Sequence, residues 1–173
     1  MKKALFLAVL LLAGIVASAQ SSDYNRVSVG YHSFSLHAEG LSVGSEPGFN
    51  LQYTRGIGFT DKAPLFLEVG GKLNFTPTNG LQLLRLTVPV SVAYKYTIPN
   101  TEVFIQPFAG VDLISNVYAE NTDGIKRVQG GWHLGGNIGY KKVNLGVSYN
   151  RDFTDFYDHV TSGMIALDFG ILF

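Results

Sequence analysis

The chain has 173 residues, of which 15% are charged and 13% aromatic, with 13 basic and 13 acidic side chains and no cysteine. This balance gives no basic excess that would point to nucleic acid, and the missing cysteine excludes disulfides and a lipid-modified N-terminal cysteine. An ordinary soluble domain has about 25% charged residues, so this surface suits lipid better than water.

The first twenty residues have the pattern of a secretory signal peptide. A basic start, Lys2–Lys3, precedes an apolar run, Ala4–Ala17, and Ala17–Ala19 is a small-residue cleavage pattern. We expect residues 1–19 to be cleaved and 20–173 to form one domain with 11 basic and 13 acidic residues. No later apolar run is long enough for a membrane-spanning helix, so any crossing by the mature chain is expected as strands.

Alternating apolar and polar residues predict eight strands in the mature chain, because side chains alternate between the two faces of a strand. The first is expected at 26–36, with a bulge near Ser33, since Phe34 and Leu36 change parity relative to the apolar positions before them. A polar, glycine-rich connection is expected at 37–47.

The second strand, near 49–54, is followed by Arg55, which shares the parity of its apolar residues. A charge facing lipid in the middle of a membrane would cost about 2–4 kcal/mol. Arg55 is therefore expected near the membrane interface or at a slip of the register. The third strand is expected at 65–75, and the turn residues of 76–80 end it.

The fourth strand, Leu84 to Tyr96, has the clearest pattern. All seven positions of one face are apolar or aromatic, and the other face carries two charges. At about 3.3 Å per residue the segment reaches about 43 Å. Tilted by about 40°, it spans about 33 Å, more than the roughly 25 Å of an outer-membrane hydrocarbon layer. We therefore interpret it as a strand of a transmembrane barrel.

Two prolines lie inside expected strands: Pro89 in the fourth and Pro107 in the fifth, at 103–114. Proline cannot donate a ladder hydrogen bond, and a closed barrel has no edge on which to place it. We expect a bulge or a locally broken pairing at each proline, most simply with the two near one another on adjacent strands.

The last three strands are expected at 132–140, 143–150 and 164–173, with polar connections from Ala119 to Gly130 and from Arg151 to His159. Connections after the second, fourth and sixth strands are short and most others longer, as in bacterial outer-membrane barrels with both chain ends in the periplasm. The predicted fold is all-β, an eight-stranded antiparallel up-and-down transmembrane β-barrel. A secreted, soluble lipocalin-like barrel with the apolar face inward is the alternative.

The interior of an eight-stranded barrel is only wide enough for its side chains, so we expect a packed plug and no aqueous pore. Buried charges must pair. Proton or ion conduction is the alternative to this structural role. The expected network consists of Glu68, Lys72, Arg85, Lys95, Asp112 and Asp168, with Asn74, Asn137, Asn144 and His133 between them.

Two segments carry a family resemblance, and they read T-V-P-V-S-V-A-Y-K-Y from Thr87 to Tyr96 and I-Q-P-F-A-G-V-D-L from Ile105 to Leu113. This apolar-Pro-apolar pattern resembles the PorT-like small barrels of the outer-membrane protein β-barrel domain family of Gram-negative bacteria. The resemblance covers essentially the whole mature chain and implies an outer-membrane location more than an activity. The end of the chain is similar to the signal read by the barrel-assembly machinery, at Ile165, Leu167, Phe169, Ile171 and Phe173.

Polar residues that could perform chemistry gather around the first and last loops. The first and last strands are neighbours in a closed barrel, so these groups could meet, but their spacing does not require the contact of about 2.6–3.2 Å that a nucleophile and its base need. Ordinary loop polarity explains them better, and they lack a metal-binding spacing. They are His32, Ser33, Ser35, His37 and Glu39, and Asp155, Asp158, His159 and Ser162.

The sequence therefore favours an integral outer-membrane barrel without enzymatic activity, cofactor or metal, with a structural or surface-loop binding role. Its expected partners are outer-membrane lipid and lipopolysaccharide, the barrel-assembly machinery and a surface ligand at the extracellular loops, with no nucleic acid. The alternative is an outer-membrane lipid A hydrolase or acyltransferase that uses the His, Ser and Asp residues of the loops.

Overall fold

The computed structural model describes residues 23–38, 41–59, 64–77, 82–119, 125–157 and 159–173. The predicted signal peptide, residues 1–19, lies outside the described residues. Among the residues that are described, no helix has the length and hydropathy needed to cross a membrane. The strands are β1 (Tyr24–Ala38), β2 (Leu41–Gly58), β3 (Leu65–Pro77), β4 (Gln82–Tyr94), β5 (Tyr96–Thr97), β6 (Val103–Ala119), β7 (Val128–Tyr140), β8 (Val143–Asp152) and β9 (Val160–Leu172).

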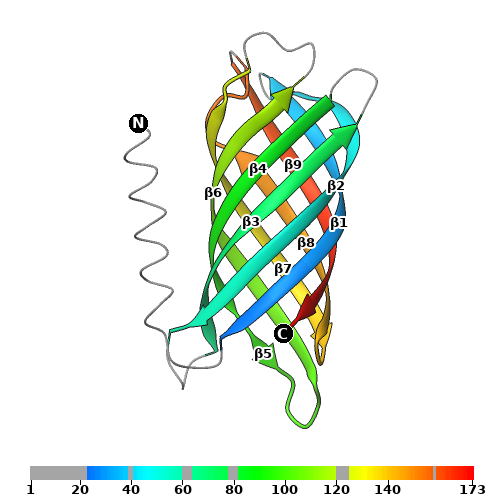
Figure 1. Ribbon diagram of the computed structural model, residues 1–173, viewed down its shortest axis with the longest axis vertical. Coiled ribbons are helices and arrows are strands. Elements are labelled where there is room, and N and C mark those ends of the chain that lie inside the picture. The colour runs from blue at the N-terminus through cyan, green and yellow to red at the C-terminus, as the bar shows by residue number, and fades with distance from the viewer. Residues whose placement is uncertain (1–22, 39–40, 60–63, 78–81, 120–124, 158) are drawn as a thin grey trace.

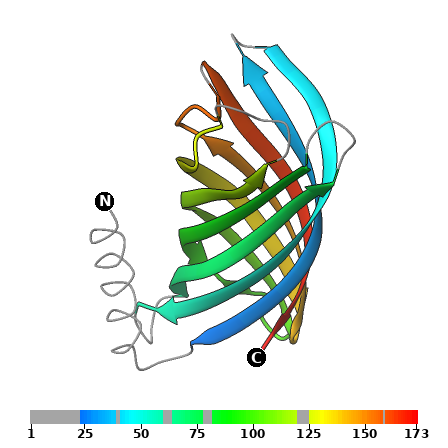
Figure 2. The same cartoon turned by 45° about the horizontal axis from the view of Figure 1, so that its top comes forward.

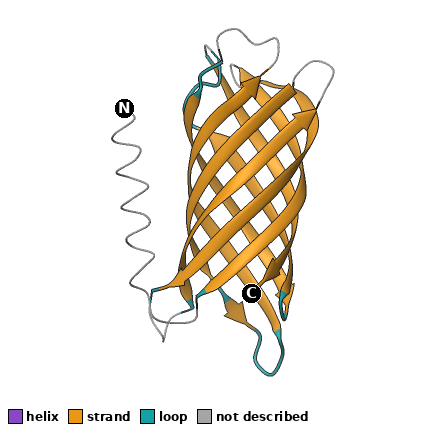
Figure 3. Ribbon diagram, viewed as in Figure 1, coloured by secondary structure: helices purple, strands orange, loops and turns teal. Residues whose placement is uncertain are grey.

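These strands form a closed antiparallel barrel (Figure 1). β1 pairs with β9 and closes the sheet, and β4 and β5 form one continuous strand against β6, separated only by Lys95. The wall is strand throughout, with loops at its two ends (Figure 3). The predicted eight-stranded barrel is confirmed. Below, the lower end is where β1 begins and β9 ends, and the upper end is the opposite one.

The strands are tilted relative to the barrel axis, and the registers define the tilt. Following paired inward residues once around the barrel from Phe34 leads back to β1 at Tyr24, ten residues lower. For eight strands about 4.8 Å apart, this shift corresponds to a tilt of about 40°. Ten residues along a strand therefore rise about 25 Å along the axis.

Large apolar side chains face outward all around the barrel and form what we term the apolar belt. Val92 and Phe169 are each 50% exposed, whereas the inward Glu68 is 2% exposed. This orientation is opposite to that of a soluble lipocalin-like barrel, so that alternative is wrong. The belt includes Val27, Val29, Tyr31, Phe49, Leu51, Leu73, Leu86, Val111, Leu134, Ile138, Leu145, Val147, Ile165, Leu167, Phe169 and Ile171.

The predicted change of phase at Ser33 is wrong. The pairing of β1 with β9 runs without a shift from Arg26 to Ala38, so Phe34 stays inward, where it is 1% exposed. Phe34 packs with Leu83 and Phe156 in an apolar cluster inside the barrel. The register shift lies on the β2 side instead, between Phe34 and Leu36.

The predicted connection at 37–47 is also wrong, because most of it is strand. β1 continues to Ala38 and β2 begins at Leu41, while the pairing of β2 with β3 starts only at Phe49. The β1–β2 hairpin therefore projects beyond its neighbours at the upper end (Figure 2). The β1–β2 connection at the upper end is therefore much shorter than predicted.

Arg55 lies near the lower end of the barrel, in agreement with the predicted position near the membrane interface. It faces outward, pairs with Asn25 of β1 and Val69 of β3 without a slip, and forms an ion pair of 3.2 Å with Asp23. Its charge is therefore neutralised at the edge of the apolar belt.

The pairing is locally broken at both prolines, as predicted. The β3–β4 ladder skips two consecutive residue pairs, one of which includes Pro89, and resumes in the same register. Pairing between β6 and the β4–β5 strand likewise skips Pro107 and resumes at Tyr96. The prolines lie on adjacent strands but interrupt different ladders, with Pro89 opposite Asp112.

Candidate functional site

The predicted interior side chains point into the barrel, where most are buried. Lys95 is only half-buried, at the lower end, and its Nζ lies 4.5 Å from the centre of the Phe104 ring. The others are at most 9% exposed: Glu68, Lys72, Arg85, Asp112 and Asp168, with Asn74, Asn137, Asn144 and His133.

At the lower end, Glu68 accepts hydrogen bonds from several side chains. Arg26 Nη2 lies 3.2 Å from its Oε1, and the Tyr24 hydroxyl donates to the same oxygen. Gln106 Nε2 donates to the Tyr24 hydroxyl at 2.5 Å. An apolar cluster surrounds this network, and the two together form the lower plug. The apolar members are Tyr24, Phe66, Ala93, Phe104 and Leu172.

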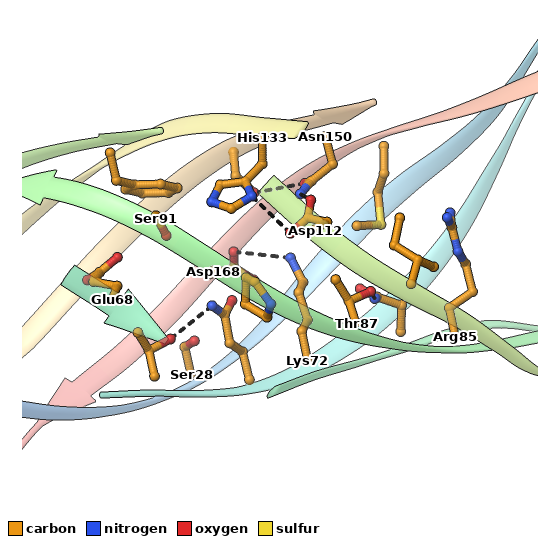
Figure 4. Close-up of a pocket in the computed structure, with 18 of the residues that line it drawn as sticks. Ser28, Glu68, Lys72, Arg85, Thr87, Ser91, Asp112, His133, Asn150 and Asp168 are labelled. Carbon is orange, nitrogen blue, oxygen red and sulfur yellow. Dashed lines mark hydrogen bonds and ion pairs between the residues drawn. The ribbon is translucent and has the colours of Figure 1, made fainter. Parts of the chain in front are cut away.

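The middle of the barrel holds two weaker charge contacts (Figure 4). Lys72 Nζ lies 3.9 Å from Asp168, and His133 Nδ1 lies 2.9 Å from Asp112, which also accepts from Asn150 at 3.3 Å. A polar cavity of about 40 Å³ lies between these side chains. A water molecule needs about 10–15 Å³, so the cavity has room for about three waters and not for a continuous aqueous channel.

At the upper end, Arg85 is held by a buried acid. Its Nη2 lies 2.8 Å from Asp152, its Nη1 donates to Ser162 at 3.1 Å, and its guanidinium lies 5.4 Å from the Phe34 ring centre. With Phe34, Leu83 and Phe156 this group forms the upper plug. The interior is therefore polar in the middle, and near each end it combines a buried ion pair with an apolar cluster.

Two partners in this network were not predicted. Arg26 was placed only at the start of a strand, and Asp152 was placed in the loop from Arg151 to His159. Both continue the inward parity of their strands, Arg26 two residues before Ser28 and Asp152 two residues after Asn150. Extending the alternation by one residue pair at each strand end would have identified them.

The candidate catalytic residues are divided by the barrel wall. His32 points inward and lies 3.0 Å from the Thr76 hydroxyl, and Ser162 belongs to the upper plug. Ser35 and His37 lie on the outer wall, with Oγ and Nε2 3.1 Å apart. Ser33 contacts Ser45, Asp155 pairs with Lys126 and His159 is exposed, whereas Glu39 and Asp158 lie outside the described residues.

Ser35 and His37 are thus the one Ser–His contact that the described residues form in this set. Ser35 Oγ also lies 3.4 Å from the Gly163 carbonyl oxygen, to which it donates. A hydroxyl that donates there is not oriented toward His37 as its base. Within the described ranges, no group of three or more His, Cys, Asp or Glu side chains could hold a metal ion.

The segment read as a barrel-assembly signal lies on the outer face of β9. Its five residues are 50–63% exposed and belong to the lipid-facing side of the wall: Ile165, Leu167, Phe169, Ile171 and Phe173. Recognition by an assembly machinery stays a prediction.

No protein-family model and no curated protein matches the chain. Solved structures do match. Neisserial surface protein A has a TM-score of 0.60 at 15% identity, covering 87% of this chain and 97% of its own. The chain has the fold of the small outer-membrane β-barrels. Ail, the attachment invasion locus protein of Yersinia pestis, in complex with the heparin analogue sucrose octasulfate, has a TM-score of 0.51 at 16% identity, covering 88% and 100%.

The outer membrane enzyme PagL also matches, with a TM-score of 0.60 at 10% identity, covering 87% of this chain and 99% of its own. One of the proteins that share this fold is thus an enzyme, and a fold by itself does not decide whether a protein catalyses a reaction. The shared architecture therefore defines the fold of the chain, and its function is argued from its own residues.

Proposed function

We propose that the protein is an integral outer-membrane β-barrel without enzymatic activity, with a plugged interior and a surface-exposed end that contacts ligands. The apolar belt carries this proposal, because outward side chains such as Val92 and Phe169 are stable only against lipid or a partner. A predicted signal peptide and the fold shared with outer-membrane proteins support the location.

The upper end is the surface-exposed end in this proposal. It carries the projecting β1–β2 hairpin and the two longest connections between strands, 120–127 and 153–159. The connections at the lower end, 59–64, 98–102 and 141–142, have six, five and two residues. Short periplasmic turns and longer outer loops are the usual arrangement. The complex of Ail with a heparin analogue supports a ligand-binding role for a barrel of this fold.

We also propose the finer relationship to PorT-like small barrels, on the segments Thr87–Tyr96 and Ile105–Leu113. Outer-membrane lipid, lipopolysaccharide and the barrel-assembly machinery remain the proposed partners, the last through the outer face of β9. Interior residues have a structural role here, because each buried cation except the half-buried Lys95 has a carboxylate within 4 Å.

Membrane fractionation with heat-modifiable gel mobility tests the proposal. The protein is expected in the outer-membrane fraction and to migrate differently with and without boiling, because a closed barrel resists detergent until heated. Recovery in the soluble periplasmic fraction, with mobility independent of heating, would contradict it.

A lipid A hydrolase or acyltransferase is the second candidate, favoured by the contact between Ser35 and His37 and by the fold shared with PagL. Ser35 would be the nucleophile and His37 its base. The test compares lipid A composition in cells carrying wild type, His37→Ala or His159→Ala. Lipid A that is the same in all three removes the enzyme candidate, and a change abolished by His37→Ala establishes it.

A further inference from the structure

A row of outward-facing residues crosses four strands near the upper end. Ser35 of β1 pairs with Gly163 of β9, which pairs with Arg151 of β8, which pairs with Trp132 of β7. Gly163 faces outward yet is buried, because the His37 ring covers it. A Cβ at Gly163 would lie 2.7 Å from His37 Nε2.

The polar atoms of this row form one cluster. Ser35 Oγ lies 3.1 Å from His37 Nε2. Burial and the charge of Arg151 lower the pKa of His37, which lies above the apolar belt, so the imidazole is neutral at neutral pH. Arg151 has no carboxylate partner among the described residues. Within the described part of the chain, the charge of Arg151 is therefore not matched by an acid.

The height of the cluster matches the headgroup region of a bilayer. Ser35 lies ten residues above Asn25 on β1, and Asn25 accepts a hydrogen bond from Tyr53 at the lower edge of the belt. Ten residues rise about 25 Å at the barrel's tilt, the height of an outer-membrane apolar band. Arg151 lies two strands further along the row and about 6 Å lower because the strands are tilted, so its long side chain reaches the headgroups by extending upward along the wall. The Trp132 and Tyr149 rings, 5.5 Å apart in an edge arrangement, lie beside Arg151 as interfacial aromatics do.

We propose that Ser35, His37 and Arg151 bind the phosphate of an anionic lipid headgroup in the outer leaflet. This inference rests on the proposed outer-membrane location and names the class of lipid that the outer wall selects. A guanidinium binds phosphate through two parallel hydrogen bonds. The Ser35 hydroxyl, two strands away on β1, adds a donor when it turns from the Gly163 carbonyl oxygen to the phosphate. The missing ion-pair partner of Arg151 is thus supplied by the lipid.

Trp132 is the single tryptophan of the chain and the cross-strand partner of Arg151, so its fluorescence reports on the lipid at this position. The mature chain is refolded into phosphatidylcholine vesicles containing increasing fractions of dibrominated phosphatidic acid, whose bromines quench tryptophan. A parallel series uses dibrominated phosphatidylcholine. Quenching is expected to show a preference for phosphatidic acid of about three- to fivefold, the range of one partly exposed ion pair.

Arg151→Ala is expected to bring this preference to about one, and Arg151→Lys to leave part of it, because an ammonium keeps the charge without the bidentate geometry. Lys142→Ala is the matched control, since Lys142 is an exposed cation just before the lower end of the same strand. The control is expected to keep the full preference.

Equal quenching by both lipids in the wild type overturns the inference, as does a preference that survives in Arg151→Ala. Loss of the preference on adding excess inorganic phosphate would assign the cluster to a soluble anion and also overturn it. If dibrominated phosphatidylcholine fails to quench Trp132 at all, the barrel is not in the bilayer and the proposed function fails as well.

Discussion

The guanidinium of Arg85 and the carboxylate of Asp152 lie 2.8 Å apart inside the upper end of the barrel, with side chains 6% and 4% exposed. The pair joins β4 to the last residue of β8, which lies across the barrel interior. An ion pair this deeply buried is held in place by its surroundings, because each charge alone would be costly to bury.

Asp152→Asn is therefore expected to destabilise the barrel by about 3–5 kcal/mol, because it leaves the Arg85 charge buried without an acid. Urea unfolding in phospholipid vesicles measures the change. Lys126→Ala is the control: its ion pair with Asp155 is exposed, with side chains 47% and 43% accessible, and should contribute at most about 1 kcal/mol. Equal effects of the two substitutions would contradict the assigned role of the interior pair.

Much of this arrangement could be predicted from alternation alone. The pattern of Leu84 to Tyr96 correctly identified a lipid-facing strand, and the inward positions of Glu68, Lys72 and Arg85 followed from parity. Alternation works there because one face meets only apolar surroundings and the other meets side chains that hydrogen-bond.

The wrong predictions concern residues near the barrel ends, where the contrast between an apolar outer face and a polar inner face is lost. Phe34 is apolar but points inward, because it packs with Leu83 and Phe156 inside the upper end of the barrel. Its parity was therefore misread as a bulge. The strand residues within 37–47 belong to the projecting β1–β2 hairpin, where glycine, proline and polar residues make the sequence look like a loop. Asp152 was missed for the same reason, and with it the partner of Arg85.

A second prediction concerns the lower plug, where Glu68→Gln keeps the hydrogen-bond acceptor for Tyr24 but removes the charge opposite Arg26. The single substitution is expected to cost about 3 kcal/mol, because the Arg26 charge is then unpaired. Adding Arg26→Met should recover most of that loss, since a buried ion pair can be replaced by neutral side chains at little cost. Vesicle unfolding of both variants measures the recovery, and additive losses would contradict it.

Two adjacent glycines of β3 should differ sharply in their tolerance of a methyl group. A Cβ at Gly70 would lie 2.2 Å from the Tyr53 carbonyl oxygen, a backbone atom that cannot easily move, whereas a Cβ at Gly71 meets nothing within 4 Å. Gly70→Ala is expected to cost about 1–3 kcal/mol through overpacking, and Gly71→Ala to stay within about 0.5 kcal/mol of wild type. The midpoint of heat-modifiable gel migration gives the order, and a reversed order would show that β2 and β3 do not approach this closely.

The two plugs predict how the interior responds when one end is opened. Wild type is expected to pass no ion current in a planar bilayer, because the cavity between the plugs has room for about three waters. Phe34→Ala with Phe156→Ala removes the aromatic part of the upper plug but leaves Arg26, Glu68 and their apolar surroundings at the lower end. The double variant should therefore stay silent.

Adding Phe66→Ala and Phe104→Ala removes two of the three aromatic rings of the lower plug and leaves Tyr24 in its polar network. Current steps are then expected, since the side chains left at the lower end and in the middle of the barrel are mostly polar. Heat-modifiable mobility of each variant shows that the barrel has formed before its conductance is measured. Current from the upper-end variant alone would mean that the lower plug does not close the interior. Current from the wild type would replace the structural role of the interior with the conduction alternative.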